Sequence, residues 1–360
     1  MTEALLVSTA PVFKVDGQTH GEMARDLIRL EVEESTEGQK TLTARLMAVG
    51  PKPGQGTEDL LYIDGTLDFG KPLEVSLGAT AEARTIFKGK ISALEISFHE
   101  GSPPEVMVFA EDQLMDLRMT RHSKTYKNKS DADIASDIAS QHGLQADVAA
   151  DGPTYKVVQQ FNTSDLAFLR ERGSLVQAEV WLDENKLCFK TRGNRSGTAI
   201  TLVQGNHLID VQARADLAHL RTKVKVSGYD AGARDKIEEE AGSDAVNAEV
   251  SGGKTGVSIL QQAFGDRVSF RVRGAPLESA HASAWSKAEM LRRARGFVTV
   301  AGVTRGTPDM VVGSKLALQN LGKPFEGDGY YVTRVLHAYD SVDGHRTRFS
   351  AERATIQEGS

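Results

Sequence analysis

The segment from Ala248 to Thr255 has the spacing of a phosphate-binding loop, with a small residue, four positions and then Gly253-Lys254-Thr255. In such a loop, backbone amides and the lysine hold the phosphates of a nucleotide, and the final hydroxyl binds a magnesium ion. The loop also requires a buried strand before it and a helix after it, within a parallel sheet. The preceding residues, Ser243 to Asn247, make a poor core strand, and Ala248 replaces the first glycine of the pattern. We therefore favour a glycine-rich surface loop over a nucleotide site.

Three aspartates, Asp131, Asp133 and Asp137, are spaced closely enough to suggest a cation site. A calcium loop, however, requires a glycine at its sixth position and a glutamate at its twelfth. Those positions hold Ser136 and His142. We interpret Asp131 and Asp133 as acids of a first helical turn, where the helix dipole favours negative charge.

The remaining residues that could carry chemistry are isolated from one another. Cys188 alternates with Leu187 and Phe189, which is typical of a strand residue rather than of a nucleophile. There is no Gly-x-Ser-x-Gly elbow, and no carboxylate pair stands out for glycoside hydrolysis. The histidines lack the i, i+4 pairing of a zinc site: His20, His99, His122, His142, His207, His219, His281, His337 and His345. We therefore assign no catalytic, cofactor-binding or metal-binding residue, and we predict that the protein is not an enzyme and uses no cofactor.

Basic residues gather between Arg118 and Lys129, where lysines and arginines interleave with Tyr126. Such a patch suits a phosphate group or an acidic partner surface, although a solvated linker is the interpretation that we favour. Its basic members are Arg118, Arg121, Lys124, Lys127 and Lys129.

The composition is that of a globular protein with several domains. The 360 residues carry 43 Lys+Arg against 49 Asp+Glu, which gives a net charge of −6 and argues against a protein that coats nucleic acid. Hydrophobic residues at 40% and charged residues at 26% exclude disordered, collagen-like and coiled-coil classes. A single cysteine excludes an intramolecular disulfide and fits a reducing cytoplasm. Met1 to Val15 lacks the pattern of a signal peptide, and no apolar run approaches the ~20 residues of a membrane span.

Residues 1–118 have the pattern of a first β-barrel lobe. Leu73, Val75 and Leu77 alternate with polar residues, which predicts a strand with one buried face. Apolar residues alternate again up to Phe98, and Glu105 to Ala110 predicts the return strand after a turn rich in glycine and proline.

Residues 119–195 predict a small inserted α+β domain. Ser130 and Asp133 have the spacing of a capping box, and a helix is expected from there to Gly143. A second helix is expected from Ser164 to Gly173. A hairpin should follow, turning at Asp183-Glu184-Asn185.

Residues 196–360 predict a second β-barrel lobe. A mobile or extended loop is expected at 230–263, because Asp235 to Ala241 is charged and the next residues are rich in Gly, Ala and Ser. A helix is expected at about 277–295, from the spacing of Leu277, Ala284 and Leu291. A closing hairpin is expected around Ser341 to Gly344. The fold class predicted for the chain is thus β-dominated α+β, with two antiparallel tube-like β-barrel lobes, which can exchange strands, around the insert.

Several segments, in this order, resemble the phage late control D protein family, the baseplate hub family of phage tails. That family is related to the N-terminal part of the spike proteins of type VI secretion systems. The most specific segment, Val158 to Arg170, is similar to the family pattern Q-x-N-x-S-D-x-x-F-L-x-R. The other matching segments are Phe87 to Ile91, Val108 to Leu117, Lys127 to Ile134, Gly329 to His337 and Gly344 to Phe349.

The resemblance implies a structural protein of a phage tail or phage-like contractile injection system. Three subunits, each with two tube-like barrels, would form a homotrimer with a pseudo-sixfold ring that joins the hexameric tail tube to the trimeric spike. The implied partners are the tube protein, the spike protein and other baseplate proteins, with DNA or cargo passing through the lumen. The chain would be made in the bacterial cytoplasm and assembled into a virion tail or injection particle. The net charge of −6 would suit a lumen that repels DNA. Since the sequence stops at Ser360, we expect a separate spike tip.

The alternative that the sequence leaves open is a β-rich module that binds a cell-envelope polysaccharide or another carbohydrate. It would bind through aromatic residues such as Trp181, Tyr330 and Tyr331. Trp181 is equally well explained as a core residue.

Overall fold

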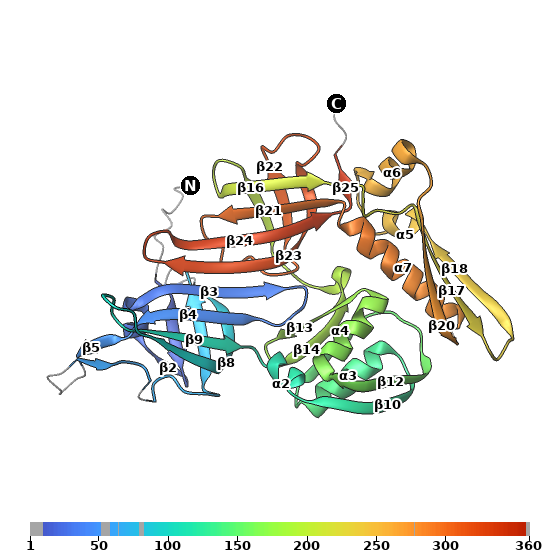
Figure 1. Cartoon of the computed structure of the whole chain (residues 1–360). Helices are drawn as coiled ribbons and strands as arrows, with labels where there is room; N and C mark the ends of the chain where they lie inside the picture. Colours follow the sequence, from blue (N-terminus) through green and yellow to red (C-terminus); the bar gives the residue numbers. More distant parts are fainter. Residues whose placement is uncertain (1–9, 52–57, 64, 79–82, 277, 358–360) are drawn as a thin grey trace.

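The computed structural model describes residues 10–51, 58–63, 65–78, 83–276 and 278–357. Most of the N-terminal segment Met1 to Val15, Leu277 of the expected helix and the chain end at Ser360 lie outside the described residues. The described chain is built mainly of antiparallel strands with fewer helices (Figure 1). The predicted β-dominated α+β class is confirmed.

Eight antiparallel strands form the centre of the molecule, and both lobes contribute four of them (Figure 1). The lobes join where β23 pairs with β3, with Arg334 opposite Ser35 and Asp340 opposite Arg29. A single sheet therefore runs through both lobes. Its strands in spatial order are β16 (Leu208–Ala215), β21 (Val298–Thr304), β24 (Gly344–Arg353), β23 (Gly327–Asp340), β3 (Leu27–Ser35), β4 (Thr41–Met47), β9 (Glu105–Glu111) and β8 (Arg84–Ser97).

These strands form because their side chains alternate between apolar and polar. In β3, Leu30 and Val32 are buried while Arg29, Glu31 and Glu33 lie on the opposite face. Burying one apolar face holds the register, since a shift by one residue would expose the whole set.

Shorter strands close each lobe around its core. In the first lobe, β7 (Pro72–Leu77) pairs with the first half of β8, and β1 (Val12–Val15) and β2 (Gln18–Thr19) follow. In the second lobe, β22 (Lys315–Gln319) pairs with β23, and β15 (Ala199–Val203) pairs with β22. The first lobe also holds β5 (Val49–Pro51), β6 (Glu58–Leu60) and α1 (Gly21–Arg25).

The insert is a small α+β unit. Ser130 caps α3 as expected, because its Oγ accepts the Asp133 N–H at 3.2 Å and its N–H donates to Asp133 Oδ2 at 2.9 Å. The second helix, α4, continues past the expected end at Gly173 to Val176. Gly173 lies inside the helix, where it packs against the Ala178 carbonyl, and Gln177 ends the helix in the left-handed conformation. The elements are α2 (Leu114–Arg118), β10 (Arg121–Lys129), α3 (Asp131–Gln141), β11 (Gln145–Ala149), β12 (Tyr155–Ser164), α4 (Asp165–Val176), β13 (Ala178–Asp183), β14 (Lys186–Thr191) and the 3-10 turn η1 (Arg192–Asn194).

The prediction of a loop at 230–263 is wrong. The segment forms part of a separate unit, in which β17 and β18 make a hairpin and β20 adds in parallel to β17. Charge did not prevent a strand here because Lys225 on β17 lies 3.5 Å from Glu238 and 3.4 Å from Glu240 on β18. The elements are β17 (Lys223–Asp230), β18 (Asp235–Ala241), α5 (Ser243–Asn247), β19 (Lys254–Thr255), α6 (Gly256–Phe264), β20 (Val268–Pro276) and α7 (Ser279–Arg295), with β25 (Thr355–Ile356) paired to β19.

Helix α7 links this unit to the insert. Its residues Ala282 and Trp285 are buried in the same cluster as Tyr155 of β12 and Val226 of β17. Separate clusters fill the first lobe and the second lobe. The boundaries at 118/119 and 195/196 stay a prediction.

Candidate functional site

The central sheet has two free edges. Strand β8 changes partner along its length, pairing with β7 from Arg84 to Lys90 and with β9 from Lys90 to Ser97. Ile91 is bonded to Gly70 and Lys71 on this side, so residues 92–97 have one edge that faces none of the described strands. At the other end of the strand order, β16 pairs only with β21 among the described strands. Unpaired edges of this kind expose N–H and C=O groups that another chain can pair with.

The sheet face that points away from the cores carries charges of both signs. Arg29 Nη2 lies 2.6 Å from Glu31 Oε1 on the same strand. Arg334 of β23 reaches across to Glu33 of β3, with Nε 2.5 Å from Oε1. This face is therefore not purely acidic, because arginines neutralise several of its carboxylates.

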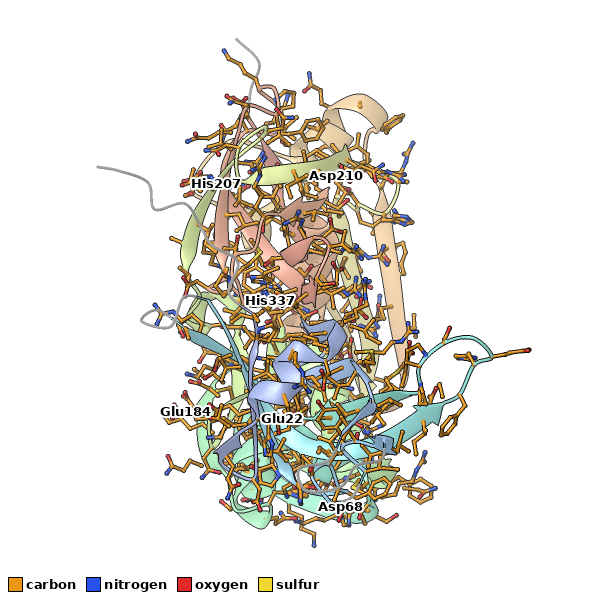
Figure 2. The ribbon with its side chains drawn as sticks, turned by 90° about the vertical axis from the view of Figure 1, so that its left-hand side faces the viewer. Glu22, Asp68, Glu184, His207, Asp210 and His337 are labelled. Carbon is orange, nitrogen blue, oxygen red and sulfur yellow. The ribbon has the colours of Figure 1, made fainter. Side chains whose placement is uncertain are left out.

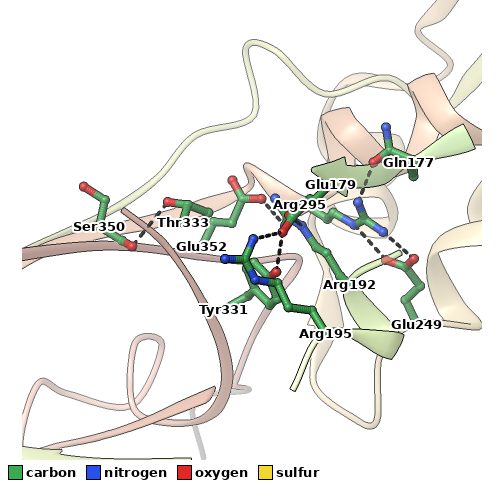
Figure 3. A network of polar contacts seen from close by, with 10 residues as sticks. All are labelled: Gln177, Glu179, Arg192, Arg195, Glu249, Arg295, Tyr331, Thr333, Ser350 and Glu352. Atoms are coloured by element: carbon green, nitrogen blue, oxygen red, sulfur yellow. Dashed lines mark hydrogen bonds and ion pairs between the residues drawn. The ribbon is translucent and has the colours of Figure 1, made fainter. Parts of the chain in front are cut away.

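A buried polar network holds the two lobes and the insert together (Figure 3). Arg195 follows η1 of the insert, and its Nη2 donates to Glu34 of the first lobe at 2.7 Å. Its Nη1 donates to Glu179 of β13 at 2.9 Å. The Tyr331 hydroxyl of the second lobe donates to the same Glu179 carboxylate at 2.7 Å. Arg192 adds a bond to Glu179 at 2.9 Å and one to Glu352 of β24.

The network is largely buried, and its charged groups have partners. The Arg195 side chain is 2% exposed, and its guanidinium lies 4.2 Å from the centre of the Trp181 ring. Burial, together with the nearby Glu179 carboxylate, raises the pKa of Tyr331 well above its ordinary value. Tyr331 therefore stays a neutral donor. Buried ion pairs are tolerated when geometry and added hydrogen bonds satisfy them.

A second polar link joins the insert to α7. Arg295 donates to Glu249 with Nε at 2.9 Å and Nη2 at 2.6 Å, and its Nη1 donates to Gln177 at the end of α4 (Figure 3). The same arginine thus contacts two segments that are far from it in the sequence.

The residues of the phosphate-loop pattern do not form such a loop. Thr255 caps α6, with its Oγ1 accepting the Ser258 N–H at 3.3 Å, and β19 pairs antiparallel with β25. Lys254 Nζ donates to Gln262 at 2.7 Å. A short helix, α5, precedes the pattern in place of the required strand.

The three aspartates have separate structural partners. Asp133 completes the α3 capping box, and Asp137 pairs with Lys129. Asp131 is 2% exposed, and its Oδ1 accepts from Arg172 Nε at 2.6 Å. Among the described residues, there is no group of three or more His, Cys, Asp or Glu that could hold a metal ion.

Two of the histidines are paired in the core of the sheet, which the sequence did not indicate. His337 Nδ1 and His345 Nε2 lie 3.2 Å apart, and His337 Nε2 donates to the Met310 carbonyl at 3.1 Å. Burial lowers the pKa of His337 to about 3 and that of His345 to about 4. Both imidazoles are therefore neutral near neutral pH.

Cys188 is buried in β14, and burial raises the pKa of its thiol to about 11. This agrees with a strand residue, because a reactive cysteine needs a lowered pKa.

Four of the five basic residues of the cluster lie on strand β10 rather than in a linker, and Arg118 ends α2. Strand β10 pairs only with β12 among the described strands, and most of its side chains are exposed. Lys129 pairs with Asp137, and Lys124 lies 4.9 Å from the Tyr126 ring.

The aromatic residues of the carbohydrate-binding alternative are not available as a platform. Tyr330 is 0% exposed and Tyr331 is 5% exposed. The guanidinium of Arg195 covers Trp181. These positions overturn the aromatic basis of that alternative.

The residues of the buried network were not identified from the sequence. One signal was present, because Glu34 occupies an inward position in β3, in phase with Leu30 and Val32. A charge at a core position predicts a buried partner. The partner itself, Arg195, lies too far along the chain to be inferred.

Comparison with solved structures identifies the class of fold. The 43 kDa tail protein of prophage MuSo2 from Shewanella oneidensis aligns with a TM-score of 0.69 at 13% identity, over 96% of this chain and 98% of that one. The tail protein of Neisseria meningitidis MC58 aligns with a TM-score of 0.66 at 12% identity, over 96% of each. The c3393 protein of E. coli, a component of the type VI secretion system, aligns with a TM-score of 0.57 at 12% identity, over 97% of this chain and 79% of that one. The chain thus has the fold of phage tail and type VI secretion proteins, and the resemblance to that group is confirmed.

The family model described as the Alg8 N-terminal domain matches residues 28–341. The chain belongs to the Alg8 N-terminal domain family. No curated protein matches it. None of the helices in the described part of the chain is long and apolar enough to cross a membrane.

Proposed function

We propose that this protein is the baseplate hub of a phage tail or phage-like contractile injection particle. Three copies form a ring with pseudo-sixfold symmetry that joins a hexameric tube to a trimeric spike. The observation that carries the proposal is the open eight-strand sheet, with four strands from each lobe and a free edge at both ends.

Strand directions support closure of this sheet into a ring. Neighbouring strands are antiparallel throughout, so β16 and β8, the first and the eighth, run in opposite directions. When residues 92–97 of one copy meet β16 of the next, the new pair is antiparallel like every other pair in the sheet. A head-to-tail contact of this kind generates a closed ring when the rotation between copies closes. Each copy contributes two lobes, which gives six lobes in a trimer.

The buried network supports the same role. A ring of six similar lobes requires a fixed angle between the two lobes of each copy. Glu34, Glu179 and Tyr331 come from the first lobe, the insert and the second lobe, and Arg195 with Arg192 joins them. The network fixes that angle through directional bonds.

The work of this protein is mechanical, and we propose that it catalyses no reaction. Its partners in this proposal are the tube protein, the spike protein and other baseplate proteins. It is made in the bacterial cytoplasm and assembled into a tail or injection particle, with DNA or cargo passing through the lumen.

Amide hydrogen exchange tests the proposed ring contact directly. At a protein concentration where the trimer forms, amides at the free edges in 92–97 and 208–215 should exchange far more slowly than in dilute monomer. The interior strands β3 and β4, which are paired on both sides in either state, serve as the internal control. Fast exchange at both edges in a trimeric sample would contradict the proposal.

A further inference from the structure

Strands β10 and β12 pair with each other to form a two-stranded ribbon, which lies along the lower rim of the insert in Figure 1. One face of the ribbon is closed, because Tyr126 and Val158 are buried in the core of the insert. Successive residues of a strand point to opposite faces. The residues between these buried ones therefore form an outer face, which is open to solvent.

The outer face combines a lysine, apolar side chains and neutral hydrogen-bonding groups. Lys127 lies directly opposite Val157 in the strand register, and two residues along Thr125 lies opposite Gln159. Opposite residues share a face, so these four side chains form one patch. Phe161, at the next outward position, is 81% exposed, and Val157 is 54% exposed. The amide and hydroxyl groups between the apolar side chains favour a ligand that both stacks and forms hydrogen bonds over a lipid surface.

The ribbon is basic throughout. Residues 117–130 contain five lysines and arginines, residues 152–164 contain one, and neither segment contains an aspartate or glutamate. The chain as a whole has a net charge of −6, so this basic excess is local. The side of the molecule drawn in Figure 2 exposes the carboxylates of Glu22, Asp68, Glu184 and Asp210. An anionic ligand is therefore attracted to the ribbon in particular.

Three of the six basic side chains are neutralised, and three are free for a ligand. The neutralised ones are in the pairs Arg118–Glu111 at 2.6 Å, Lys156–Glu278 at 3.0 Å and Lys129–Asp137. Arg121, Lys124 and Lys127 pair with no carboxylate in the part of the chain that the structure describes. Asp165 lies 3.7 Å from His122, but it is 3% exposed and points into the insert.

The free arginine is fixed close to the exposed aromatic residue. The strand register shifts at this point, so that Phe161 and Asn162 both lie opposite Ser123. Arg121 Nη1 donates to the Asn162 carbonyl across the ribbon at 3.0 Å, and the Asn162 N–H donates to Ser123 Oγ at 3.2 Å. Nucleic-acid bases stack on exposed aromatic rings, and guanidinium groups bind phosphates. The bulge thus presents both kinds of contact from neighbouring residues.

We propose that the outer face of the β10–β12 ribbon binds single-stranded nucleic acid. The phosphates contact Arg121, Lys124 and Lys127, and a base stacks on Phe161. A single strand is required because the bases of a duplex are already stacked on one another and cannot cover the ring. Three phosphate contacts make a local site, which agrees with a chain too acidic to be coated by nucleic acid. The inference does not depend on the hub function.

Fluorescence anisotropy of a labelled oligothymidylate of about 15 nucleotides, titrated with the purified full chain at several salt concentrations, tests the charges. The variant Arg121→Gln/Lys127→Gln should bind at least tenfold more weakly. Its slope of log affinity against log salt should be shallower by about 1.4, at about 0.7 for each phosphate contact removed. The matched control, Lys88→Gln/Lys287→Gln, removes two exposed lysines outside the ribbon and should bind as the parent does.

The same titration tests the aromatic contact. Phe161→Ser should bind at least fivefold more weakly with an unchanged salt slope, because stacking releases no counterions. Its control, Phe270→Ser, removes a ring that is 69% exposed on β20 and should have no effect.

Three results would overturn this site: no binding by the parent at low salt, parent-like binding by both ribbon variants, or equally tight binding of a duplex. Displacement of the oligonucleotide by poly-glutamate of equal charge would overturn it as well, because the ribbon would then accept any acidic chain. None of these results bears on the hub proposal, which the mass of the assembled protein tests separately.

Discussion

Arg195 and Glu34 are 161 positions apart in the chain, and their side chains meet with Nη2 2.7 Å from Oε1. The contact ties the insert to the first lobe at the point where the second lobe also arrives through Tyr331. Arg195 and Glu179 together therefore connect the first lobe, the insert and the second lobe.

Replacing this arginine should destabilise the protein strongly. Arg195→Met removes a buried cationic partner from both Glu34 and Glu179, and breaking a buried pair costs about 3–5 kcal/mol. The measurement is the urea unfolding midpoint. The control is Lys14→Met, which removes a partly exposed pair with Glu74 and should cost about 0–1 kcal/mol. Equal midpoints for the two variants would contradict the role assigned to the network.

Two glycines with similar backbone angles should respond differently to alanine. Gly17 has φ +79°, and a Cβ added there would have no atom within 4 Å. Gly38 has φ +91°, and a Cβ added there would collide with the Val180 carbonyl oxygen. Gly17→Ala should cost only the backbone strain of about 1–2 kcal/mol. Gly38→Ala should cost about 1–3 kcal/mol more, because the turn must move away from the insert. Thermal unfolding of the two variants measures this difference, and equal costs would show that the turn does not press on the insert.

Stability should fall with acid because of the histidine pair. The folded pKa values of His337 and His345, about 3 and about 4, are below the ordinary value of about 6.5. Between these values the unfolded chain takes up protons that the folded chain does not, so stability that is complete above about pH 6.5 is lost as the pH falls. Each histidine contributes at most about 1.4 kcal/mol per pH unit in that window.

The comparison that isolates this effect is the parent against His337→Gln/His345→Gln, with urea unfolding at pH 7.5, 6 and 5. As the pH falls, the free energy of unfolding of the parent should decrease more than that of the variant, because only the parent has the histidine pair. Asp112 acts in the opposite direction, because burial raises its pKa to about 6, but it is present in both proteins and cancels. A difference that does not change with pH would contradict the assignment.

The single cysteine should be inert in the folded protein. Cys188 is 1% exposed and burial raises the pKa of its thiol to about 11, so little thiolate forms at pH 8. A disulfide reagent such as dithionitrobenzoate should react slowly with the native protein and rapidly in 6 M guanidinium. Rapid reaction of the native protein would mean that β14 opens readily.

Local patterns predicted much of this fold, because the strands bury one face and the turns use residues with special backbone geometry. The alternation in β7, the hairpin at Asp183 to Asn185 and the cap at Ser130 all depend on residues close in sequence. The β17–β18 hairpin escaped prediction because its stability comes from lysine and glutamate pairs across two strands. Taken along the sequence alone, the same charges indicate a solvated loop.

The free edges of the sheet escaped prediction for a similar reason. The free edge at 92–97 exists only because β7 ends where β9 begins to pair with β8, which is a property of the whole sheet. The motif resemblance indicated the class of protein, and the pairing pattern then located the edges.

The measurement that tests the central claim most directly is the solution mass of the purified protein, by light scattering on a size-exclusion column. Three chains of 39.0 kDa give about 117 kDa, and the hub proposal predicts this mass, reached in the pure protein or on addition of its spike protein. A protein that stays at 39.0 kDa alone and with the spike protein, at concentrations far above those in an assembling particle, would contradict it.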